Sequence, residues 1–404
     1  MQKVVVIGQG YTGRLSIVRS VAEMGCDITI IALLRHAYYE ENLKITKPLD
    51  AYSKYVNKTL YCENYNEKML VDTLLEQCVD PEQKSFIFPD NDFSAAVVDK
   101  HRDELKDHFY IPHIHERAGA VEEWMNKSKQ KALASQLGLN VVHAVPLQVR
   151  NRSFVIPDSI TYPCFAKPLV SLVGGKSGLK RCNDKTKLEK HINNYLDTHR
   201  FDDVDFMIED FKAIDREYAT LGFSDGNEVI IPGLLELLRM GHDNHFGVAL
   251  QGRVFPVTGY EEVVEKFKKL VKEIGFVGVF DIDFFESGGE FYFCELNLRF
   301  GGSGYAFTRS GVNLPVMLMK SILGESLDGM NKTITSESTY FNERMAYDDW
   351  YNGHMTTEEL NKIRKESEIK FIENETDPAP QKMLDKEFRI QRIKKTIKGW
   401  IGRK

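Results

Sequence analysis

The sequence lacks the features of secreted, membrane-spanning and zinc-binding proteins. Its six cysteines are scattered, with no C-x-x-C pair and no zinc-like spacing, which indicates reduced, buried thiols rather than a disulfide framework. No run of about 18 apolar residues occurs, and no basic leader precedes the β-branched run that starts at Lys3. Internal repeats and low-complexity segments are also missing. We therefore expect a cytoplasmic protein.

A surplus of positive charge is missing as well. The chain has 53 Lys and Arg against 59 Asp and Glu, a net charge of -6, which argues against a protein that coats nucleic acid. Its composition, 42% hydrophobic and 28% charged, is that of a soluble globular protein. At 404 residues the chain suits two or three domains, which favours an enzyme with a cleft between domains.

Hydrophobic patterning predicts an α/β domain followed by α+β structure. Lys3–Ile7 is a β-branched run, followed by a glycine-rich turn, a helical pattern and a second buried strand over Asp27–Leu34. This β-α-β opening predicts a doubly wound parallel sheet. Later patterns predict a helix over Lys127–Leu137 and another over Glu261–Ile274. We expect an N-terminal domain at 1–115, a small subdomain with a linker helix at 116–205, a second subdomain with a metal site at 206–330 and an extension at 331–404.

A glycine-rich turn lies between the first predicted strand and helix. Gly8, Gly10 and Gly13 match the G-x-G-x-x-G pattern, in which glycines let a pyrophosphate approach a helix N-terminus. The second strand lacks the terminal acid that holds the ribose of NAD, but Arg35 after it can meet the 2′-phosphate of NADP. Such turns also serve merely to pack a strand against its helix. An NADP-dependent oxidoreductase stays open as an alternative.

A second pattern, over 279–299, predicts a β-hairpin with one polar face. Polar and apolar residues alternate on both sides of a Ser-Gly-Gly turn. Pairing about the second turn glycine sets Asp283 opposite Glu295 and Asp281 opposite Asn297. The polar face also receives Arg299, Phe285 and Phe293. The core face receives Phe280, Ile282, Phe284, Cys294, Leu296 and Leu298.

The polar face of this hairpin has the chemistry of a magnesium site. Clustered carboxylates repel one another unless a cation or a proton lies among them. Hard oxygen ligands on rigid strands suit Mg²⁺, which prefers a few carboxylates plus the phosphates of a nucleotide. Arg299 extends the pattern toward an anion site. A solvated polar face with a surface arginine is the alternative.

Glu295-Leu296-Asn297-Leu298-Arg299, preceded twelve residues earlier by Asp283, resembles the E-x-N-x-R signature of ATP-grasp enzymes. The resemblance implies an N-terminal parallel-sheet domain followed by an ATP-grasp fold of two α+β subdomains, with ATP and two Mg²⁺ (or Mn²⁺) as cofactors. It also implies that Asp283, Glu295 and Asn297 hold the metal and that Arg299 acts in catalysis on the transferring phosphoryl group. Asp281 is an additional acid whose role as a ligand stays open.

Further segments resemble the same superfamily in the same order. They are two phosphate-contacting lysines, a small-residue loop over the phosphates, an interdomain hinge that receives adenine, and an acid that contacts ribose. The residues assigned in this way are Lys127, Lys167, Gly174, Gly175, Lys176, Gly178, Glu209, Phe211 and Glu217. Lys176 is expected to act in catalysis with Arg299. For each lysine or acid taken alone, a purely structural role is the alternative.

Within the superfamily the chain is similar to the carboxylate-amine ligases, in particular the carbamoyl-phosphate synthase and D-aspartate ligase branch. This similarity implies that a substrate carboxylate attacks the γ-phosphate of ATP and that an amine then attacks the acyl phosphate, releasing ADP and phosphate. The expected partners are therefore a small carboxylate and a small amine. Gly10, Arg239 and Ser303 are candidates for substrate contacts. A nucleotide-binding regulatory protein without turnover is the remaining alternative.

The C-terminus is strongly basic, in contrast to the whole chain. Eight of the nineteen residues over 386–404 are Lys or Arg, and Ile390, Ile393, Ile397 and Ile401 recur at helical spacing. A basic amphipathic helix can lie on an anionic membrane. This predicts peripheral contact with the inner face of a membrane, where a lipid-linked cell-envelope precursor would be a substrate. The alternative is a helix that packs on the enzyme or on the second subunit of a homodimer.

Overall fold

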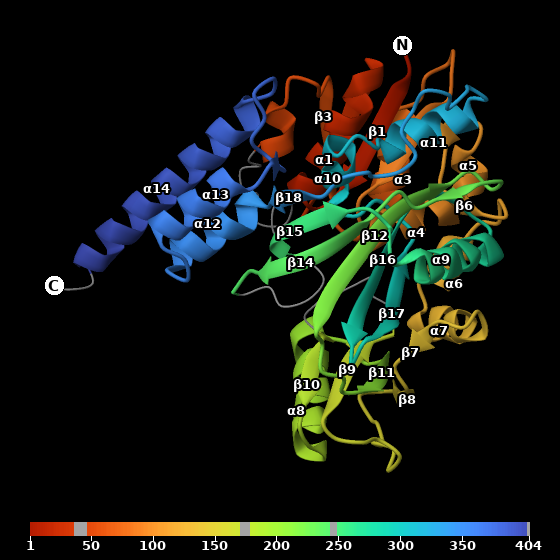
Figure 1. The fold of residues 1–404 in the computed structure, drawn as a ribbon, viewed down its shortest axis with the longest axis vertical. Helices are drawn as coiled ribbons and strands as arrows, with labels where there is room; N and C mark the ends of the chain where they lie inside the picture. Colours follow the sequence, from red (N-terminus) through yellow and green to blue (C-terminus); the bar gives the residue numbers. More distant parts are fainter. Residues whose placement is uncertain (36–46, 170–177, 243–248, 402–404) are drawn as a thin grey trace.

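The computed structural model describes residues 1–35, 47–169, 178–242 and 249–401, with side chains up to residue 394. Three β-sheets organise this part of the chain: a five-stranded parallel sheet, a four-stranded sheet and a ten-stranded sheet. Figure 1 shows the parallel sheet above the large sheet, the small sheet below them, and the C-terminal helices beside the parallel sheet. No helix among the described residues is long and apolar enough to span a membrane.

The first sheet is doubly wound, as the opening pattern predicts. Its strand order is β3-β2-β1-β4-β5 and every pair in it is parallel. Alternate residues of β1 face opposite ways: Val4 and Val6 share a core with helix α1, whereas Val5 and Ile7 share one with α3 and α4. The elements are β1 (Lys3–Gly8), α1 (Tyr11–Val21), β2 (Asp27–Leu34), β3 (Lys58–Glu63), α3 (Glu67–Gln77), β4 (Ser85–Pro89), α4 (Asp92–Lys100), α5 (Arg102–Leu105) and β5 (Phe109–Tyr110).

A four-stranded antiparallel sheet and a ten-stranded mixed sheet follow the parallel one. The smaller has the order β10-β9-β11-β8, and its core is closed by apolar residues of helix α8. Its elements, with the helices before it, are α6 (Ala120–Trp124), α7 (Lys127–Gln136), β8 (Ala144–Val149), β9 (Cys164–Pro168), β10 (Lys180–Cys182), α8 (Lys185–His199) and β11 (Val204–Asp210). α7 begins with an Asn126 side chain that accepts a hydrogen bond from the backbone of Lys129, and Gly138 follows its end at φ 78°.

The larger sheet contains the predicted hairpin near one end of its strand order. Its main order is β19-β18-β15-β14-β12-β16-β17-β7, with β13 paired to β12 and β6 paired to β16. The strands are β6 (His113–Ile114), β7 (Asn140–Val141), β12 (Arg216–Ser224), β13 (Val229–Ile230), β14 (Leu234–Met240), β15 (Ala249–Phe255), β16 (Phe276–Ser287), β17 (Glu290–Asn297), β18 (Ser338–Phe341) and β19 (Ile369–Lys370). Helices α9 (Glu261–Ile274), α10 (Gly304–Arg309) and α11 (Leu314–Ile322) pack against this sheet. α9 has the predicted bounds, and Gly275 ends it at φ 74°.

The C-terminal extension is joined to both neighbouring sheets. Its strands β18 and β19 lengthen the large sheet, and its helices are α12 (Glu343–Asn352), α13 (Thr357–Glu366) and α14 (Ala379–Ile401). The buried Arg19 of α1 bonds Asp377 at 3.1 Å and also donates to two backbone carbonyl groups, of Phe371 and Ile372. Asp377 also accepts from Ser53 at 2.8 Å. These bonds tie the extension to the N-terminal domain.

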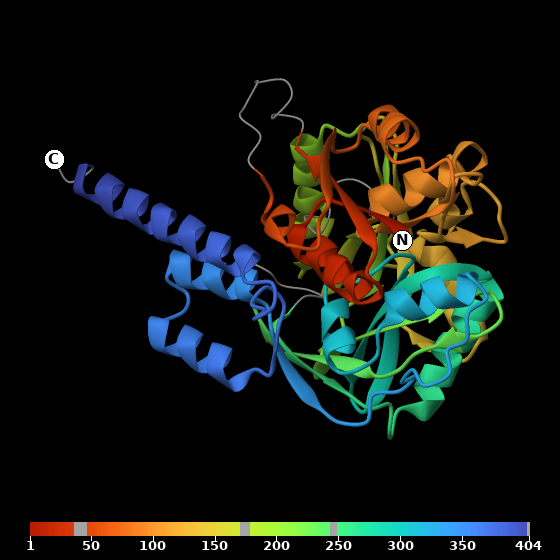
Figure 2. The same ribbon diagram turned by 90° about the horizontal axis from the view of Figure 1, so that it is seen from above.

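Helix α14 begins against the body of the protein and then projects away from it (Figure 2). Leu384 and Phe388 near its start are buried, whereas Ile390 is 42% exposed and Ile393 is 54% exposed. Packing on the enzyme's own body therefore does not cover these two isoleucines. The predicted contact with a membrane or a second subunit stays a prediction, because Ile397 and Ile401 lie beyond the described side chains.

The Arg19 contact gives a stability prediction. Arg19→Ala leaves the buried Asp377 carboxylate without its cation, so we expect the free energy of unfolding to fall by about 3–5 kcal/mol in urea unfolding followed by circular dichroism. Lys320→Ala removes the partly exposed partner of Glu325 and should cost about 1 kcal/mol or less. Equal losses in the two variants would contradict the structural role of Arg19.

Candidate active site

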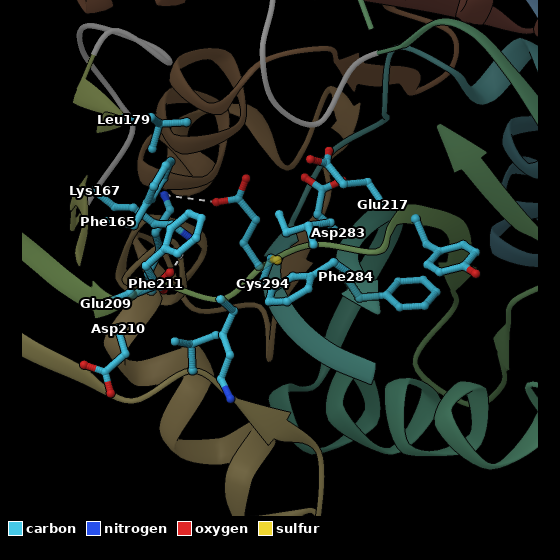
Figure 3. Close-up of a pocket in the computed structure, with 17 residues that line it drawn as sticks. Phe165, Lys167, Leu179, Glu209, Asp210, Phe211, Glu217, Asp283, Phe284 and Cys294 are labelled. Atoms are coloured by element: carbon cyan, nitrogen blue, oxygen red, sulfur yellow. Dashed lines mark ion pairs between the residues drawn. The ribbon is translucent and has the colours of Figure 1, made fainter. Parts of the chain in front are cut away.

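A cavity of about 270 Å³ lies between the small sheet and the large sheet. β9 and the hinge after β11 form one side, and β12, β16 and β17 form the other (Figure 3). Seven of the residues that the sequence analysis assigned to nucleotide or metal line this cavity although they are far apart in the chain. They are Lys127, Lys167, Glu209, Phe211, Glu217, Asp283 and Glu295.

The Glu209 carboxylate is shared by two lysines at the floor of the cavity. Lys167 of β9 bonds one oxygen at 2.7 Å, and Lys131 of α7 bonds the other. The side chain of Glu209 is 5% exposed, so the pair of cations is needed to balance its burial. Two positive charges against one negative charge leave a surplus cation here, which suits the binding of an anion.

The pKa directions agree with this arrangement. Burial alone would raise the pKa of Glu209, but Lys167 and Lys131 overcome burial and hold that pKa below its ordinary value. For Lys167, burial works against the charged form and the Glu209 carboxylate outweighs it, so its pKa is raised. For Lys131, burial dominates and lowers the pKa. Lys167 is therefore the lysine whose positive charge is more firmly maintained.

The hairpin brings the predicted metal ligands together. Asp283 pairs with Glu295 and Asp281 with Asn297 across β16 and β17, which confirms the predicted register at this end. The Asn297 amide donates to Asp283 at 3.5 Å. Glu295 lies 3.1 Å from the ammonium group of Lys127. The first lysine and the acidic face therefore meet at one end of the cavity.

These donors fit Mg²⁺ that arrives with a nucleotide. No group of three or more His, Cys, Asp or Glu residues able to hold a metal occurs within the described part of the chain. Asp283, Glu295 and Asn297 offer two carboxylates and one amide, all partly exposed. Mg²⁺ is commonly held by one or two carboxylates plus substrate phosphates, and it keeps several waters. The phosphates would have to supply the remaining ligands.

Arg299 connects the polar face of the hairpin to the N-terminal domain; this face carries the candidate metal ligands Asp283, Glu295 and Asn297 and is called the metal face below. Its Nε donates to Asp92 at 2.8 Å and an Nη donates to the Asn297 side chain at 3.3 Å. Burial alone would lower the pKa of Arg299, but Asp92 and Asp281 raise it. The arginine is thus held as a cation between the two domains.

One part of the predicted hairpin is wrong. Nearer the turn, Phe284 pairs with Phe293 and Ser287 with Glu290, so a β-bulge lies between this pairing and the Asp283–Glu295 pair. Because a bulge adds one residue to one strand, side chains beyond it change faces. Phe293 therefore lies in the hydrophobic core, on the face predicted for Cys294, and Cys294 lines the cavity instead. Burial raises the pKa of the Cys294 thiol to about 12.

Aromatic side chains form the end of the cavity near the hinge. Phe165 of β9 and Phe211 after β11 both line it, and the guanidinium of Arg181 lies 4.1 Å from the centre of the Phe211 ring. Phe285 stacks on Tyr292 with ring centroids 5.3 Å apart. Flat apolar walls of this kind suit an aromatic base.

The remaining predicted residues lie elsewhere. Arg239 is 3.9 Å from Glu359 of α13 and does not line the cavity. Ser303 precedes α10 and hydrogen-bonds Tyr340 of β18. Gly10 precedes α1 and is exposed, and Gly178 is buried with Pro168 and Tyr195 close to its Cα. Gly174, Gly175 and Lys176 lie outside the described residues, so their predicted role stays a prediction.

The structure argues against a dinucleotide at the glycine-rich turn. A Cβ atom placed on Gly8 would lie 1.5 Å from the Asp90 carboxylate, and one on Gly13 would lie 3.0 Å from it. The space that these glycines leave open is therefore filled by a carboxylate, which would repel a pyrophosphate. This disfavours the NADP-dependent alternative.

Lys131 is a site residue that the sequence analysis missed. It follows Lys127 by four residues on α7, and residues at that spacing lie on one face of a helix. The four-residue spacing could have indicated Lys131 from the sequence. Its partner Glu209 could not be found in this way, because it lies 78 residues further along the chain.

Comparisons with known proteins agree with the geometry. Residues 132–314 match the model of the ATP-grasp domain, and this part of the chain is an ATP-grasp domain. The carbamoyl phosphate synthase large chain of Clostridium perfringens is 28% identical over 172 residues, which span 41% of this chain and 15% of that protein. The chain therefore covers only a small part of the length of this curated relative.

Solved structures share the fold. The L-amino acid ligase from Bacillus licheniformis is 16% identical with a TM-score of 0.60, and the match covers 84% of this chain and 79% of that one. N5-carboxyaminoimidazole synthetase from Staphylococcus aureus, solved with ADP, is 17% identical with a TM-score of 0.61, covering 87% of this chain and 86% of that one. At these identities the likeness establishes the ATP-grasp fold with its preceding parallel-sheet domain, and not a substrate.

The shared carboxylate gives a second stability prediction. Glu209→Gln leaves Lys131 and Lys167 as neighbouring buried cations, so we expect a loss of about 3–5 kcal/mol at pH 7 in urea unfolding. The loss should shrink as the pH rises toward the ordinary lysine pKa of about 10.4, because the lysines then lose their charge. Asp210→Asn changes the adjacent, more exposed acid and should have little effect. A loss that does not depend on pH would contradict the charge argument.

Proposed function

We propose that the protein is an ATP-dependent carboxylate-amine ligase that forms an amide bond through an acyl phosphate. One observation carries the proposal: the cavity of the ATP-grasp domain joins aromatic walls, two lysines and a face of two carboxylates and an amide in a single site. These groups match, in order, the base, the phosphates and the Mg²⁺ of a nucleotide. Relatives with matching domains or folds include named ligases and synthases.

The proposed chemistry needs no protein nucleophile. A substrate carboxylate attacks the γ-phosphate of ATP, ADP leaves, and the amine then displaces phosphate from the acyl phosphate. Lys127, Lys167 and Arg299 would neutralise the charge that spreads over the transferring phosphoryl group. Mg²⁺ on Asp283, Glu295 and Asn297 would supply further positive charge when bound. The cation surplus at Glu209 supports this assignment, because it favours an anionic ligand at the floor of the cavity.

The direct test is a product assay. The full chain is incubated with Mg-ATP, hydroxylamine and a panel of amino acids and sugar acids, and ADP, AMP and hydroxamate are measured. We expect one class of acid to release ADP and to give the hydroxamate, since hydroxylamine traps acyl phosphates. Boiled enzyme and reactions without acid are the controls. AMP and pyrophosphate as products would reject the acyl phosphate, and no acid-dependent turnover on any panel would favour a regulatory nucleotide-binding protein.

The metal face gives a prediction at residue level. Glu295→Gln and Asn297→Ala should each lower acid-dependent ADP release by at least about 100-fold, because each removes a ligand that would hold the Mg²⁺ ion that neutralises charge in the transition state. The melting temperature of Asn297→Ala should stay close to wild type, since this side chain is partly exposed. Glu295→Gln also removes the partner of the buried Lys127, so a lower melting temperature is expected for it, and circular dichroism at the assay temperature must show that it is folded. Glu290→Gln, on the exposed end of the same strand, is the matched control and should keep wild-type turnover. Wild-type activity in Glu295→Gln and Asn297→Ala would end the metal assignment.

A further inference from the structure

The side chain of Lys127 is almost buried, and it lies next to a candidate metal ligand. Its ammonium group is 3.1 Å from the Glu295 carboxylate, and the two side chains are 8% and 30% exposed. Lys127 is the first residue of α7, whereas Glu295 lies on β17 and is paired with Asp283 of β16. A fixed positive charge therefore reaches the metal face from a separate element of the fold.

A pair of hydrogen bonds holds α7 on β17 at this point. The Gln130 side chain accepts from the backbone N–H of Leu296 at 2.9 Å and donates to the Leu296 carbonyl at 2.8 Å. Gln130 is buried and lies three residues after Lys127, on the same face of the helix. Because Leu296 directly follows Glu295, these bonds keep the start of α7 beside the carboxylate. The Lys127–Glu295 pair is thus part of the packing between helix and strand.

The acid that Lys127 bonds distinguishes it from two other cations of the site. Lys167 bonds Glu209 at 2.7 Å and Arg299 bonds Asp92 at 2.8 Å, and neither acid is a candidate metal ligand. A divalent cation held by Glu295 would lie close to the Lys127 ammonium group, whichever carboxylate oxygen it used. Like charges repel strongly at such separations where water is partly excluded. A free metal ion is therefore disfavoured at the metal face while Lys127 stays beside Glu295.

The phosphates of a nucleotide change this balance. They are anions that offer the Lys127 ammonium group a new partner, and they bring ligands of their own for the metal. We propose that the Lys127–Glu295 pair makes the metal face selective for Mg²⁺ that arrives with a nucleotide over free Mg²⁺. Lys127 is then a specificity-determining residue, and this inference rests on the proposed ligase function. Its effect is that the metal ligands are filled together with the phosphoryl donor.

Binding of Mn²⁺ without nucleotide tests this selectivity, because electron paramagnetic resonance measures the free ion. Lys127→Met removes the charge and keeps the apolar stem, so it should bind Mn²⁺ alone about 10-fold more tightly than wild type, or better. Lys127→Gln is neutral and keeps a donor for Glu295, so it should show the same gain. Lys127→Arg keeps the cation and should stay close to wild type.

Two controls locate the effect. Lys212→Met removes an exposed cation of the same cavity that bonds Tyr292, so solvent screening should keep Mn²⁺ binding within about twofold of wild type. Combining Lys127→Met with Glu295→Gln should abolish the gain, because the carboxylate ligand is then missing. Equal gains in Lys212→Met and Lys127→Met would reveal a general charge effect and would overturn the inference.

The same titrations separate this inference from the proposed function. With AMP-PCP, a nonhydrolysable ATP analogue, the wild type should bind Mn²⁺ about 10-fold more tightly or better, after correction for the Mn²⁺ that AMP-PCP binds in solution. No Mn²⁺ binding even with AMP-PCP would remove the metal site and the proposed function with it. Equal affinities of wild type and folded Lys127→Met for Mn²⁺ alone would overturn only the selectivity. If melting curves show that neither neutral variant folds, the wild type decides, since equal affinity with and without AMP-PCP would overturn the inference.

Discussion

The cavity depends on one buried carboxylate, that of Glu209, which holds two lysines from different parts of the chain. Lys167 comes from the neighbouring strand of the small sheet, and Lys131 comes from the helix that precedes that sheet. Burial would make any one of these charges unfavourable, so each is stable only with the others in place. The result is a floor with a surplus positive charge, fixed before any ligand arrives. Such preorganised charge is what transfer of a phosphoryl group requires.

The hairpin of β16 and β17 supplies the opposite charge from the other sheet. Its period of two sets Asp283 and Glu295 side by side, while Ile282 and Leu296 fill the core behind them. The bulge then lets Cys294 face the cavity and Phe293 the core. Lys127 bonds Glu295 across the cavity, so the cationic and anionic parts meet where a metal and phosphates would lie.

The N-terminal domain and the C-terminal extension are parts of the same framework. Residues of α1, of helices α10 and α11 and of the extension share a single hydrophobic core. Arg19 adds buried bonds between α1 and the extension, and Arg299 adds one between the metal face and α4. The N-terminal domain is consequently held in a defined place relative to the cavity.

The sequence by itself determined what depends on local periodicity and on residue type. The bounds of α9, the doubly wound opening and the pairing of Asp283 with Glu295 follow from patterns within short continuous stretches of the chain. The ATP-grasp assignment followed from the order of short motifs. Long-range partners could not be found in this way, because they depend on how separate elements pack.

Only the tertiary structure decided the partners of the site. In the structure Lys131 bonds Glu209, and the Asp90 carboxylate lies against Gly8. Arg239 lies near Glu359 and not in the cavity. It also decided the face of Cys294, since a bulge depends on the fit of a whole strand between its neighbours and not on the hydrophobic period. Charge pairs between distant segments form only when packing brings those segments together. The charged residues could therefore be identified from the sequence, whereas their partners could be identified only from the structure.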